Sequence, residues 1–290
     1  MDLKGKNVLL IGLAKTGIST IKLLDKLEAN ITVNDIKTEE KLADILEELK
    51  DIKNATYILG YHPEEVDHID LAVVSPGVPL DLPFIQKLYS NNIKVIGEVE
   101  LAYELSNNPT FIGITGTNGK TTVCNMIEDV LRDNGYDFID NKLGANVNVG
   151  VATTLINGAN FLGKTKKDLA VLEIDERSSV KIYPYLTPTY LICTNLFRDS
   201  MLRNAHSEFI SNILTKYIPK KTKLILNADD LISCNIAPTN KRVYFGIDKL
   251  TTDEKVCHNI VNDMPTCPKC DSKLQYDFVR YHHIGRAHCK

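Results

Sequence analysis

The sequence predicts an α/β protein in which parallel sheets are covered by helices. Along most of the 290 residues, short apolar runs alternate with amphipathic helical stretches, which is the pattern of parallel strands joined by crossover helices. Two of these runs lead directly into glycine-rich turns, at residues 12–17 and 113–122. A break at Asn107-Asn108-Pro109 separates two α/β stretches, so we predict two domains.

The expected elements follow from the apolar runs. For the first domain, residues 1–108, we expect strands at 7–11, 30–33, 56–59, 71–75 and 93–96, and helices at 18–27 and 39–49. For the second domain, residues 109–256, we expect strands at 111–114, 169–174, 190–193, 223–226 and 242–245, and a helix at 120–134. Residues 257–290 form a cysteine-rich segment. The length allows each domain a core of its own.

Composition argues against several classes of protein. The chain has 34 Lys and Arg against 37 Asp and Glu, a net charge of -3, so we expect no nucleic-acid partner. No apolar run reaches about 18 residues, and Met1 leads straight into an amphipathic unit instead of a signal peptide. We therefore expect no transmembrane segment and a cytoplasmic protein. Seven cysteines are too few for a disulfide scaffold of this size, and Cys124, Cys193 and Cys234 suit buried apolar positions.

The first glycine-rich turn has the position of a phosphate-binding turn. It reads Gly-Leu-Ala-Lys-Thr-Gly, follows a strand and opens a helix, whose N-terminus offers free N–H groups and partial positive charge. Asp35 ends the second strand, 18 residues after Gly17, where a carboxylate accepts hydrogen bonds from a ribose or base. Alanine replaces the second glycine of the dinucleotide-binding pattern, so an ordinary tight turn explains this segment equally well.

Two later segments favour a nucleotide site. Residues 75–79 and 97–101 also follow strands, at the end of the sheet where open α/β folds bind ligands. With the first turn they make residues 3–122 similar to the Rossmann-like N-terminal domain of the MurD type in the Mur ligase family. The resemblance implies that this domain holds the UDP part of a substrate. The contacts it implies are Leu13, Thr16, Asp35, Ser75, Pro76 and Gly77.

The second turn is the most specific motif of the chain. It reads Gly-Ile-Thr-Gly-Thr-Asn-Gly-Lys-Thr-Thr between a strand and a helix. Its glycines let successive N–H groups face one phosphate, Lys120 supplies positive charge for the outer phosphates, and the Thr121 hydroxyl is a Mg²⁺ ligand. Ile114 departs from the strict P-loop pattern, and this version resembles that of Mur ligases and folylpolyglutamate synthases. The expected ATP contacts are Gly116, Thr117, Asn118, Gly119, Lys120, Thr121 and Thr122.

Acidic and polar residues follow the next strands of the second domain. For Mg²⁺ we favour Glu173 beside Thr121, with Glu176 as second choice, although acids at such places often cap a helix instead. Asp199 follows the next strand, and another strand is followed by residues 227–230. Their shared position after successive strands indicates one site. The resemblance assigns Lys120, Glu173 and Asp199 to catalysis, and Asn227 and Asp230 to the ATP site.

The family resemblance also implies a reaction. Mur ligases are ATP-dependent carboxylate–amine ligases of peptidoglycan synthesis, and so of cell wall biogenesis, cell shape and cell division. ATP phosphorylates a carboxylate and an amine then displaces the phosphate, while Mg²⁺ and Lys120 offset charge. A UDP-binding first domain favours UDP-N-acetylmuramoyl-L-alanine as the substrate and D-glutamate as the amine.

Residues 109–289 instead resemble MurT, the ligase subunit of lipid II isoglutaminyl synthase. The likeness rests on residues 144–146, 173–176 and 195–199 and on the last cysteines. Ser200 stands where the MurD type has histidine, and Lys216 is poorly placed to match that type's carbamylated lysine. This alternative implies lipid II as substrate and a glutaminase partner.

A chain that combines the two likenesses arises by natural fusion, by recombination at the phosphate loop, or as an assembly artefact. A non-catalytic nucleotide-binding remnant is a further alternative. A Rossmann dehydrogenase would leave the phosphate loop unexplained.

The cysteines near the end predict a structural zinc site. Cys267 and Cys270 form a C-x-x-C pair, and 18 residues separate Cys270 from Cys289, whereas Zn²⁺ takes four ligands. A second pair would need a cysteine at position 292, so we expect half a zinc ribbon in this chain. Other candidates for the fourth ligand are Cys257, His282, His283 and His288. We also expect the C-terminal domain of Mur ligases to be missing, and hence nucleotide binding with little turnover.

Overall fold

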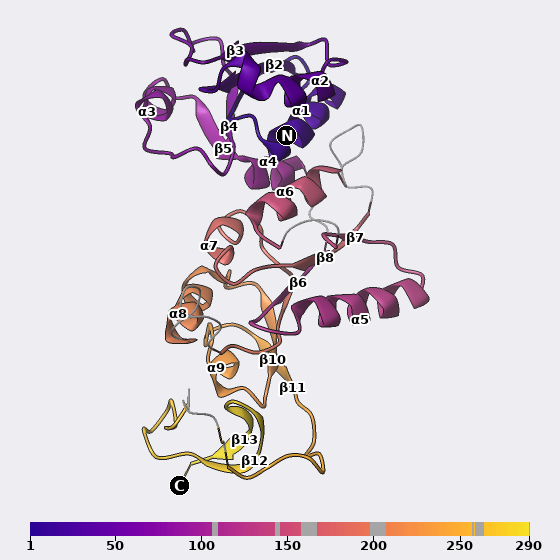
Figure 1. The fold of residues 1–290 in the computed structure, drawn as a ribbon, viewed down its shortest axis with the longest axis vertical. Helices are drawn as coiled ribbons and strands as arrows, with labels where there is room; N and C mark the ends of the chain where they lie inside the picture. Colours follow the sequence, from indigo (N-terminus) through magenta and orange to yellow (C-terminus); the bar gives the residue numbers. More distant parts are fainter. Residues whose placement is uncertain are drawn as a thin grey trace. The chain divides into compact units, whose positions relative to one another are not determined.

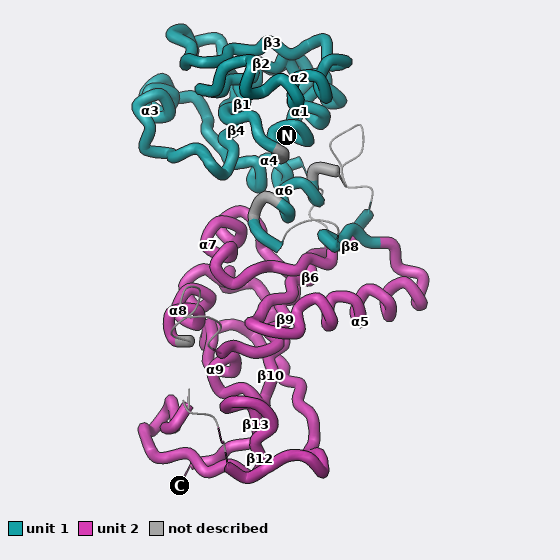
Figure 2. Tube along the Cα trace, in the orientation of Figure 1, with its two compact units in different colours: residues 1–109, 138–168 teal, residues 110–137, 169–290 magenta. Residues whose placement is uncertain are grey.

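The structure is a computed structural model of the chain, and it describes residues 1–105, 110–142, 146–157, 167–197, 207–256, 258 and 264–289. The chain forms two compact units, which Figure 2 distinguishes by colour: unit 1 comprises residues 1–109 and 138–168, and unit 2 comprises residues 110–137 and 169–290. The chain therefore passes from one unit to the other three times. The domain limits expected from the sequence, 1–108, 109–256 and 257–290, stay predictions.

Unit 1 contains a parallel sheet with the strand order β3-β2-β1-β4-β5 (Figure 1). Its strands are β1 (Asn7–Ile11), β2 (Asn30–Asp35), β3 (Ala55–Leu59), β4 (Leu71–Val74) and β5 (Lys94–Gly97). Alternate side chains of a strand point to opposite faces of the sheet. Val8, Leu9 and Leu10 are all buried, so both faces of β1 are covered, as in a doubly wound sheet.

Helices surround this sheet. They are α1 (Lys15–Lys26), the 3₁₀ turn η1 (Glu39–Leu42), α2 (Ala43–Glu48), α3 (Pro83–Ser90), α4 (Glu98–Leu105) and α6 (Asn148–Asn157); unit 1 also includes the short strand β7 (Ile139–Asp140). Helix α6 packs against α1 and α4, and its residues Val151, Ala152 and Leu155 are buried. A segment that follows part of unit 2 in sequence therefore completes unit 1.

Unit 2 contains a second parallel sheet, whose strands within this unit run in the order β11-β10-β9-β6-β8. These strands are β6 (Thr110–Thr115), β8 (Leu169–Glu173), β9 (Tyr190–Cys193), β10 (Lys223–Asn227) and β11 (Arg242–Phe245). Its helices are α5 (Lys120–Asp133), α7 (Ser179–Ile182), α8 (Ser207–Tyr217) and α9 (Leu231–Cys234). Strand β6 is central and leads through the glycine-rich loop into α5, so the loop lies at the carboxyl end of the sheet.

An antiparallel hairpin, β12 (Gln275–Tyr281) and β13 (Ile284–His288), completes unit 2. Its turn is joined to the end of β10, because His283 Nε2 donates to Asp230 Oδ1 at 2.8 Å and Gly285 N donates to Asp229 O at 2.7 Å. The ring of His282 also stacks on Phe197, with 5.3 Å between centroids. The hairpin thus packs onto the segments that follow β9 and β10.

The predicted α/β class with parallel sheets is confirmed. The strands predicted at 7–11, 190–193 and 242–245 have the observed bounds. The single helix predicted at 39–49 is instead a 3₁₀ turn followed by α2, and Thr38 provides no side-chain cap to start a regular helix there. Within the described parts of the chain, no helix combines the length and apolar character needed to cross a bilayer.

Candidate functional site

The phosphate loop of unit 2 has a backbone that only glycine tolerates at one position. Gly116 has φ +128°, and a Cβ there would lie 2.2 Å from Thr194 Oγ1. Gly119, just before α5, has φ +80°. Both values lie in the region that side chains avoid. The loop therefore curls tightly at the N-terminus of a 14-residue helix, where free N–H groups favour an anion.

The segment that follows β9 holds this loop in place. Thr117 N donates to Asn195 O at 2.7 Å, and Asn118 N donates to Asn195 Oδ1 at 3.0 Å. Thr194 Oγ1 donates to Asn118 O at 2.7 Å. The Thr117 hydroxyl accepts from Phe197 N at 3.1 Å. The Thr117 side chain and the N–H groups of Thr117 and Asn118 therefore hold the loop to the segment after β9.

Lys120 is held at the base of the loop. Its Nζ donates to Gly116 O at 2.6 Å and lies 3.5 Å from Glu176 Oε2. Glu176 is only 3% exposed. Burial raises the pKa of the Glu176 carboxyl, while the charge of Lys120 opposes that rise. Glu176 thus contacts Lys120, whereas Glu173 contacts Thr121.

Thr121 and Glu173 meet as the sequence predicted. Thr121 Oγ1 donates to Glu173 Oε2 at 2.9 Å, which brings the start of α5 and the end of β8 together. A hydroxyl and a carboxylate oxygen are ligands that Mg²⁺ prefers. The pair therefore fits a Mg²⁺ ion carried by a nucleotide at the loop, and Thr122 lies exposed beside it.

The other two residues predicted for the ATP site, Asn227 and Asp230, already have hydrogen-bond partners within the protein. Asp230 is 0% exposed and accepts from Leu196 N at 2.6 Å, Ile232 N at 2.9 Å and His283 Nε2 at 2.8 Å. It caps α9 and has no free surface for a nucleotide. The Asn227 amide is likewise bound to Thr194 O and Asp229 N, at 2.9 and 3.0 Å. Asp199 lies outside the described residues.

A pocket of 320 Å³ in unit 2 is lined by residues that neighbour Asn227 and Asp230 in the chain. Its walls include Ala228 and Asp229 after β10, Tyr244 and Phe245 of β11, and Arg286 of the hairpin. It combines aromatic, acidic and basic side chains, a mixture that suits a polar ring with hydroxyl groups. Sequence reasoning missed Arg286, because nothing in the motifs indicates that the hairpin reaches this place.

All six residues predicted to contact a UDP-substrate line one 500 Å³ pocket in unit 1: Leu13, Thr16, Asp35, Ser75, Pro76 and Gly77. Asp35 acts on its shape, because Oδ2 accepts from Leu13 N at 2.7 Å and Oδ1 accepts from Lys37 N at 2.8 Å. The carboxylate therefore ties the first turn to the end of β2. Asn34 and His62 also line the pocket, although the sequence motifs indicated neither.

The first turn and the turn after β4 approach each other closely. Gly12 has φ +92°, and a Cβ there would lie 2.8 Å from Val78 Cγ2. Ser75 Oγ lies 2.8 Å from Gly12 O and 2.7 Å from Glu98 Oε1. Glu98 is 1% exposed, and burial raises the pKa of its carboxyl, although hydrogen bonds from Ser75 and Thr16 partly offset this effect. The buried Glu98 carboxyl thus contacts Ser75, whose side chain lines the pocket.

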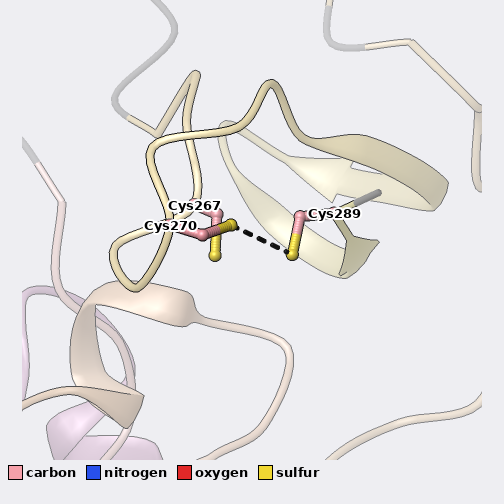
Figure 3. A group of neighbouring side chains, drawn as sticks. All are labelled: Cys267, Cys270 and Cys289. Carbon is pink, nitrogen blue, oxygen red and sulfur yellow. Dashed lines mark hydrogen bonds between the residues drawn. The ribbon is translucent and has the colours of Figure 1, made fainter.

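The cysteines of the third predicted segment come together (Figure 3). The sulfur atoms of Cys267, Cys270 and Cys289 lie within 4.8 Å of one another, and Cys270 Sγ is 3.6 Å from Cys289 Sγ. Sulfurs that share a tetrahedral Zn²⁺ are about 3.8 Å apart, so this set fits the metal. Cys257 lies outside the described residues, and His283 is already bound to Asp230.

The thiols of this cluster differ in acidity. Hydrogen bonds from the side chain and backbone of Ser272 lower the pKa of Cys270 to about 7. Hydrogen bonds to Cys267 and Cys270 raise the pKa of Cys289 to about 11. Neighbouring N–H and O–H groups therefore favour a thiolate at Cys270, which is the form that binds metal.

Two family models match the chain. Residues 6–97 match the Mur ligase MurD-like N-terminal domain, and residues 114–264 match the Mur ligase middle domain. The first range contains the pocket of unit 1, and the second contains the phosphate loop.

Curated relatives carry two names. A UDP-N-acetylmuramoylalanine–D-glutamate ligase of Clostridioides difficile is 69% identical over 130 residues, which are 45% of this chain and 29% of the relative. One of Alkaliphilus metalliredigens is 35% identical over 293 residues, 97% of this chain and 61% of the relative. Subunit MurT of the lipid II isoglutaminyl synthase of Staphylococcus aureus is 36% identical over 179 residues, 61% of this chain and 40% of the relative.

These matches extend the first likeness. Similarity to a relative named as a D-glutamate ligase covers 97% of the chain, well beyond the residues 3–122 on which the resemblance rested. The chain spans less than two thirds of the length of these relatives, between 29% and 61%.

The fold has a counterpart among solved structures. A pseudomurein peptide ligase type C from Methanothermus fervidus matches 99% of this chain and 56% of its own, with 24% identity and a TM-score of 0.55. This likeness concerns the fold alone. The middle-domain model, however, covers residues 114–264, more than half of the sequence, and the chain therefore belongs to the Mur ligase family.

Proposed function

We propose that this protein acts in the ATP-dependent addition of D-glutamate to UDP-N-acetylmuramoyl-L-alanine. The observation that carries the proposal is the phosphate loop, where Lys120 and Thr121 begin α5 and Thr121 contacts Glu173 at the end of β8. The pocket of unit 1 supports the choice of substrate, because it collects all six residues expected to contact UDP. The names of the relatives from Clostridioides and Alkaliphilus point to the same step.

The residues of unit 2 take separate parts in this reaction. Loop N–H groups and Lys120 bind the outer phosphates of ATP and offset their charge. Thr121 and Glu173 hold Mg²⁺, which supplies positive charge between the nucleotide and the carboxylate that receives the phosphoryl group. Glu176 keeps Lys120 at the loop before the nucleotide arrives, as the 3.5 Å contact indicates.

Nucleotide binding is tested by calorimetric titration of the protein with a non-hydrolysable Mg-ATP analogue. We expect saturable binding that Lys120→Met weakens at least about tenfold, because a charge-assisted contact worth roughly 1.5–3 kcal/mol is lost. Lys220→Met, which changes an exposed lysine of the same unit, serves as the matched control. Equal binding by the Lys120 variant and the control would contradict the assignment of the loop.

Substrate binding is tested by titration with UDP-N-acetylmuramoyl-L-alanine. We expect binding that Asp35→Ala abolishes, because the backbone N–H groups of Leu13 and Lys37 lose their acceptor and the pocket loses its shape. Asp51→Ala, at an exposed position of the same unit, is the control. If the wild-type protein binds the ATP analogue but not this compound, the D-glutamate-adding step is refuted.

A second candidate is amidation of D-glutamate on lipid II. The three gathered cysteines favour it, since the resemblance to MurT includes the cysteine segment, and the relative from Staphylococcus aureus carries that name. Ligase turnover with lipid II and ammonia, together with no binding of the UDP compound, would establish this alternative in place of the first.

A further inference from the structure

The carboxyl of Glu176, beside Lys120 of the phosphate loop, is buried and incompletely bound. Its Oε2 lies 3.5 Å from Lys120 Nζ, and its side chain is 4% exposed. Among the residues that the structure describes, Glu176 Oε1 has no hydrogen-bond partner. A buried carboxylate is costly unless it is paired and hydrogen-bonded, so this group depends on the charge of Lys120.

The hydroxyl of Tyr183 is a second buried group of this kind. Tyr183 is 2% exposed, and within the described parts of the chain its hydroxyl has no hydrogen-bond partner. A turn at residues 176–178 leads into α7, where Tyr183 N donates to Ser179 O at 2.9 Å and Ser179 Oγ donates to Glu176 O at 2.6 Å. Steps of three and four residues stay on one face of a helical turn. Tyr183, seven residues after Glu176, therefore lies on the same side of this segment.

The two buried groups are close enough to interact. Burial raises the pKa of the Tyr183 hydroxyl, and Cys193 and the charge of Glu176 add to this rise. The phenol therefore stays protonated and remains a hydrogen-bond donor. Cys193 is buried as well, but a thiol is only a weak donor, so Tyr183 is the better partner for a carboxylate.

ATP at the phosphate loop would draw Lys120 away from Glu176. Lys120 Nζ donates to Gly116 O at 2.6 Å, whereas the lysine of such a loop binds the outer phosphates of the nucleotide. Its distance of 3.5 Å from Glu176 is long for a charge-assisted hydrogen bond, so a phosphate competes well for the ammonium group. Glu176 would then be a buried charge without its cation, which is unfavourable. A nearby hydroxyl donor offsets this cost.

We propose that Tyr183 is a positioning residue whose hydroxyl donates to Glu176 when ATP draws Lys120 away from that carboxylate. This inference rests on the proposed binding of ATP at the phosphate loop. Tyr183 acts through Glu176 and Lys120 and does not touch the nucleotide. Because the carboxylate exchanges a cation for a hydroxyl, it keeps a partner in both states, and Lys120 leaves it at a lower cost.

Calorimetric titration of the whole chain with a non-hydrolysable Mg-ATP analogue tests this role. We expect Tyr183→Phe to bind the analogue about tenfold more weakly than the wild-type protein, because a hydrogen bond to a buried charge is lost in the bound state alone. The melting temperature of the nucleotide-free variant should be unchanged or higher, since the lost hydroxyl makes no hydrogen bond in that state. Tyr57→Phe removes another buried hydroxyl that lacks a hydrogen-bond partner among the described residues, and this matched control should keep the wild-type affinity.

A double-mutant cycle with Glu176 separates positioning from packing. In a Glu176→Met background no carboxylate receives the hydroxyl, so adding Tyr183→Phe should change the affinity by less than about twofold. Glu176→Gln keeps the size of the side chain, and in that background Tyr183→Phe should weaken binding less than in the wild-type protein, because an amide oxygen is a weaker acceptor than a carboxylate. A packing effect of the hydroxyl would be the same in every background.

Failure of this inference differs from failure of the proposed function. If Tyr183→Phe binds the analogue as tightly as the wild-type protein, or loses the same affinity with and without the Glu176 carboxylate, then Tyr183 does not support Glu176. A lower melting temperature of the nucleotide-free variant would assign the hydroxyl a structural role instead. If the wild-type protein does not bind the analogue, ATP binding at the loop is refuted, and the role of Tyr183 with it.

Discussion

Residues of the phosphate loop have two kinds of role: some set the shape of the loop, and others carry the groups that suit a phosphate or a metal. Thr117 and Asn118 were both predicted to contact ATP, and the structure ties both to residues after β9. Their side-chain and backbone bonds set the curl of the loop. Lys120 and Thr121 instead face the charged residues Glu176 and Glu173. Changes at the first pair should therefore act on loop geometry, and changes at the second pair on phosphate and metal.

Gly116→Ala should disrupt nucleotide binding through geometry alone. Its φ of +128° and the 2.2 Å between a new Cβ and Thr194 Oγ1 force the loop to shift. Strain of this kind is on the order of 1–3 kcal/mol, so we expect the ATP analogue to bind about tenfold more weakly or worse in calorimetry. Gly97→Ala, where a Cβ meets open space, should leave binding unchanged. Equal affinities for the two variants would refute the geometric argument.

Glu98 should make the stability of the protein depend on pH. Burial raises the pKa of Glu98 above its ordinary value of 4.5. Its contribution to stability is fully present below about pH 4.5 and is lost as pH rises through the raised pKa, because the unfolded chain ionises first. The Ser75 hydroxyl lies 2.7 Å from Glu98 Oε1 and donates to it, which favours the ionised form and offsets part of this rise.

Glu98→Gln should remove this dependence. We expect the melting temperature of the variant, relative to the wild-type protein, to be higher at about pH 7.5 than at about pH 4.5. Glu65→Gln, at an exposed site in the same unit, should show no such change between the two pH values. A constant difference between the Glu98 variant and the wild-type protein would show that the pKa of Glu98 is the same in the folded and the unfolded chain.

The sequence predicted residues near motifs better than residues that reach a site from elsewhere. Leu13, Thr16 and Asp35 lie at or shortly after the ends of β1 and β2, and the carboxyl ends of parallel strands meet at one edge of a sheet. His62 also lines the pocket, but it comes after β3 without a glycine-rich turn, so no motif indicates it. Asp230 follows a strand like the others, yet it caps α9, as the alternative for such acids allowed.

At the scale of elements, buried strands were predicted well because they are short apolar runs. Strand β9 lies between β6 and β10, and its two predicted ends agree with the structure. Helix α5 ends at Asp133, one residue before the predicted end. The hairpin β12–β13 was not predicted, because its strands mix charged and apolar residues, and contacts far apart in sequence, such as the buried pair of Asp230 and His283, hold it in place.

His283→Ala should loosen the attachment of the hairpin. Removing the imidazole leaves Asp230 Oδ1 buried without one of its donors, which costs roughly 1–3 kcal/mol. We expect urea unfolding followed by a probe in unit 2 to shift to lower denaturant by a corresponding amount. His258→Ala, at an exposed histidine that contacts Glu254, should shift it little. Identical unfolding curves for both variants would mean that the pair does not anchor the hairpin.

The zinc content of the protein tests the cysteine cluster near the hairpin. The sulfurs of Cys267, Cys270 and Cys289 lie within 4.8 Å of one another, a spacing that would let them share one Zn²⁺. Elemental analysis of the purified protein should give about one zinc per chain, and Cys270→Ser should lower that content. Cys124→Ser, which changes a buried cysteine of α5, is the control. Metal-free wild-type protein after growth with zinc would contradict the assignment.

At the scale of the whole molecule, each of the two units carries its own candidate ligand site. The pocket of unit 1 lies within residues that match the MurD-like domain, and the phosphate loop lies within those that match the middle domain. The sequence indicated both sites because each begins with a glycine-rich turn after a strand. It did not indicate that residues 138–168 return to unit 1, because contacts between distant segments leave no local pattern.

Because residues 138–168 belong to unit 1, unit 1 can be completed only at a late point during synthesis of the chain. Once residues 1–105 have left the ribosome, all five strands of the first sheet are available, but α6 has not yet been synthesised. Strand β6 and helix α5, which belong to unit 2, emerge first. The surfaces of α1 and α4 that later contact α6 remain bare in the meantime. The N-terminal unit of this protein therefore cannot finish folding before synthesis of its second unit has begun.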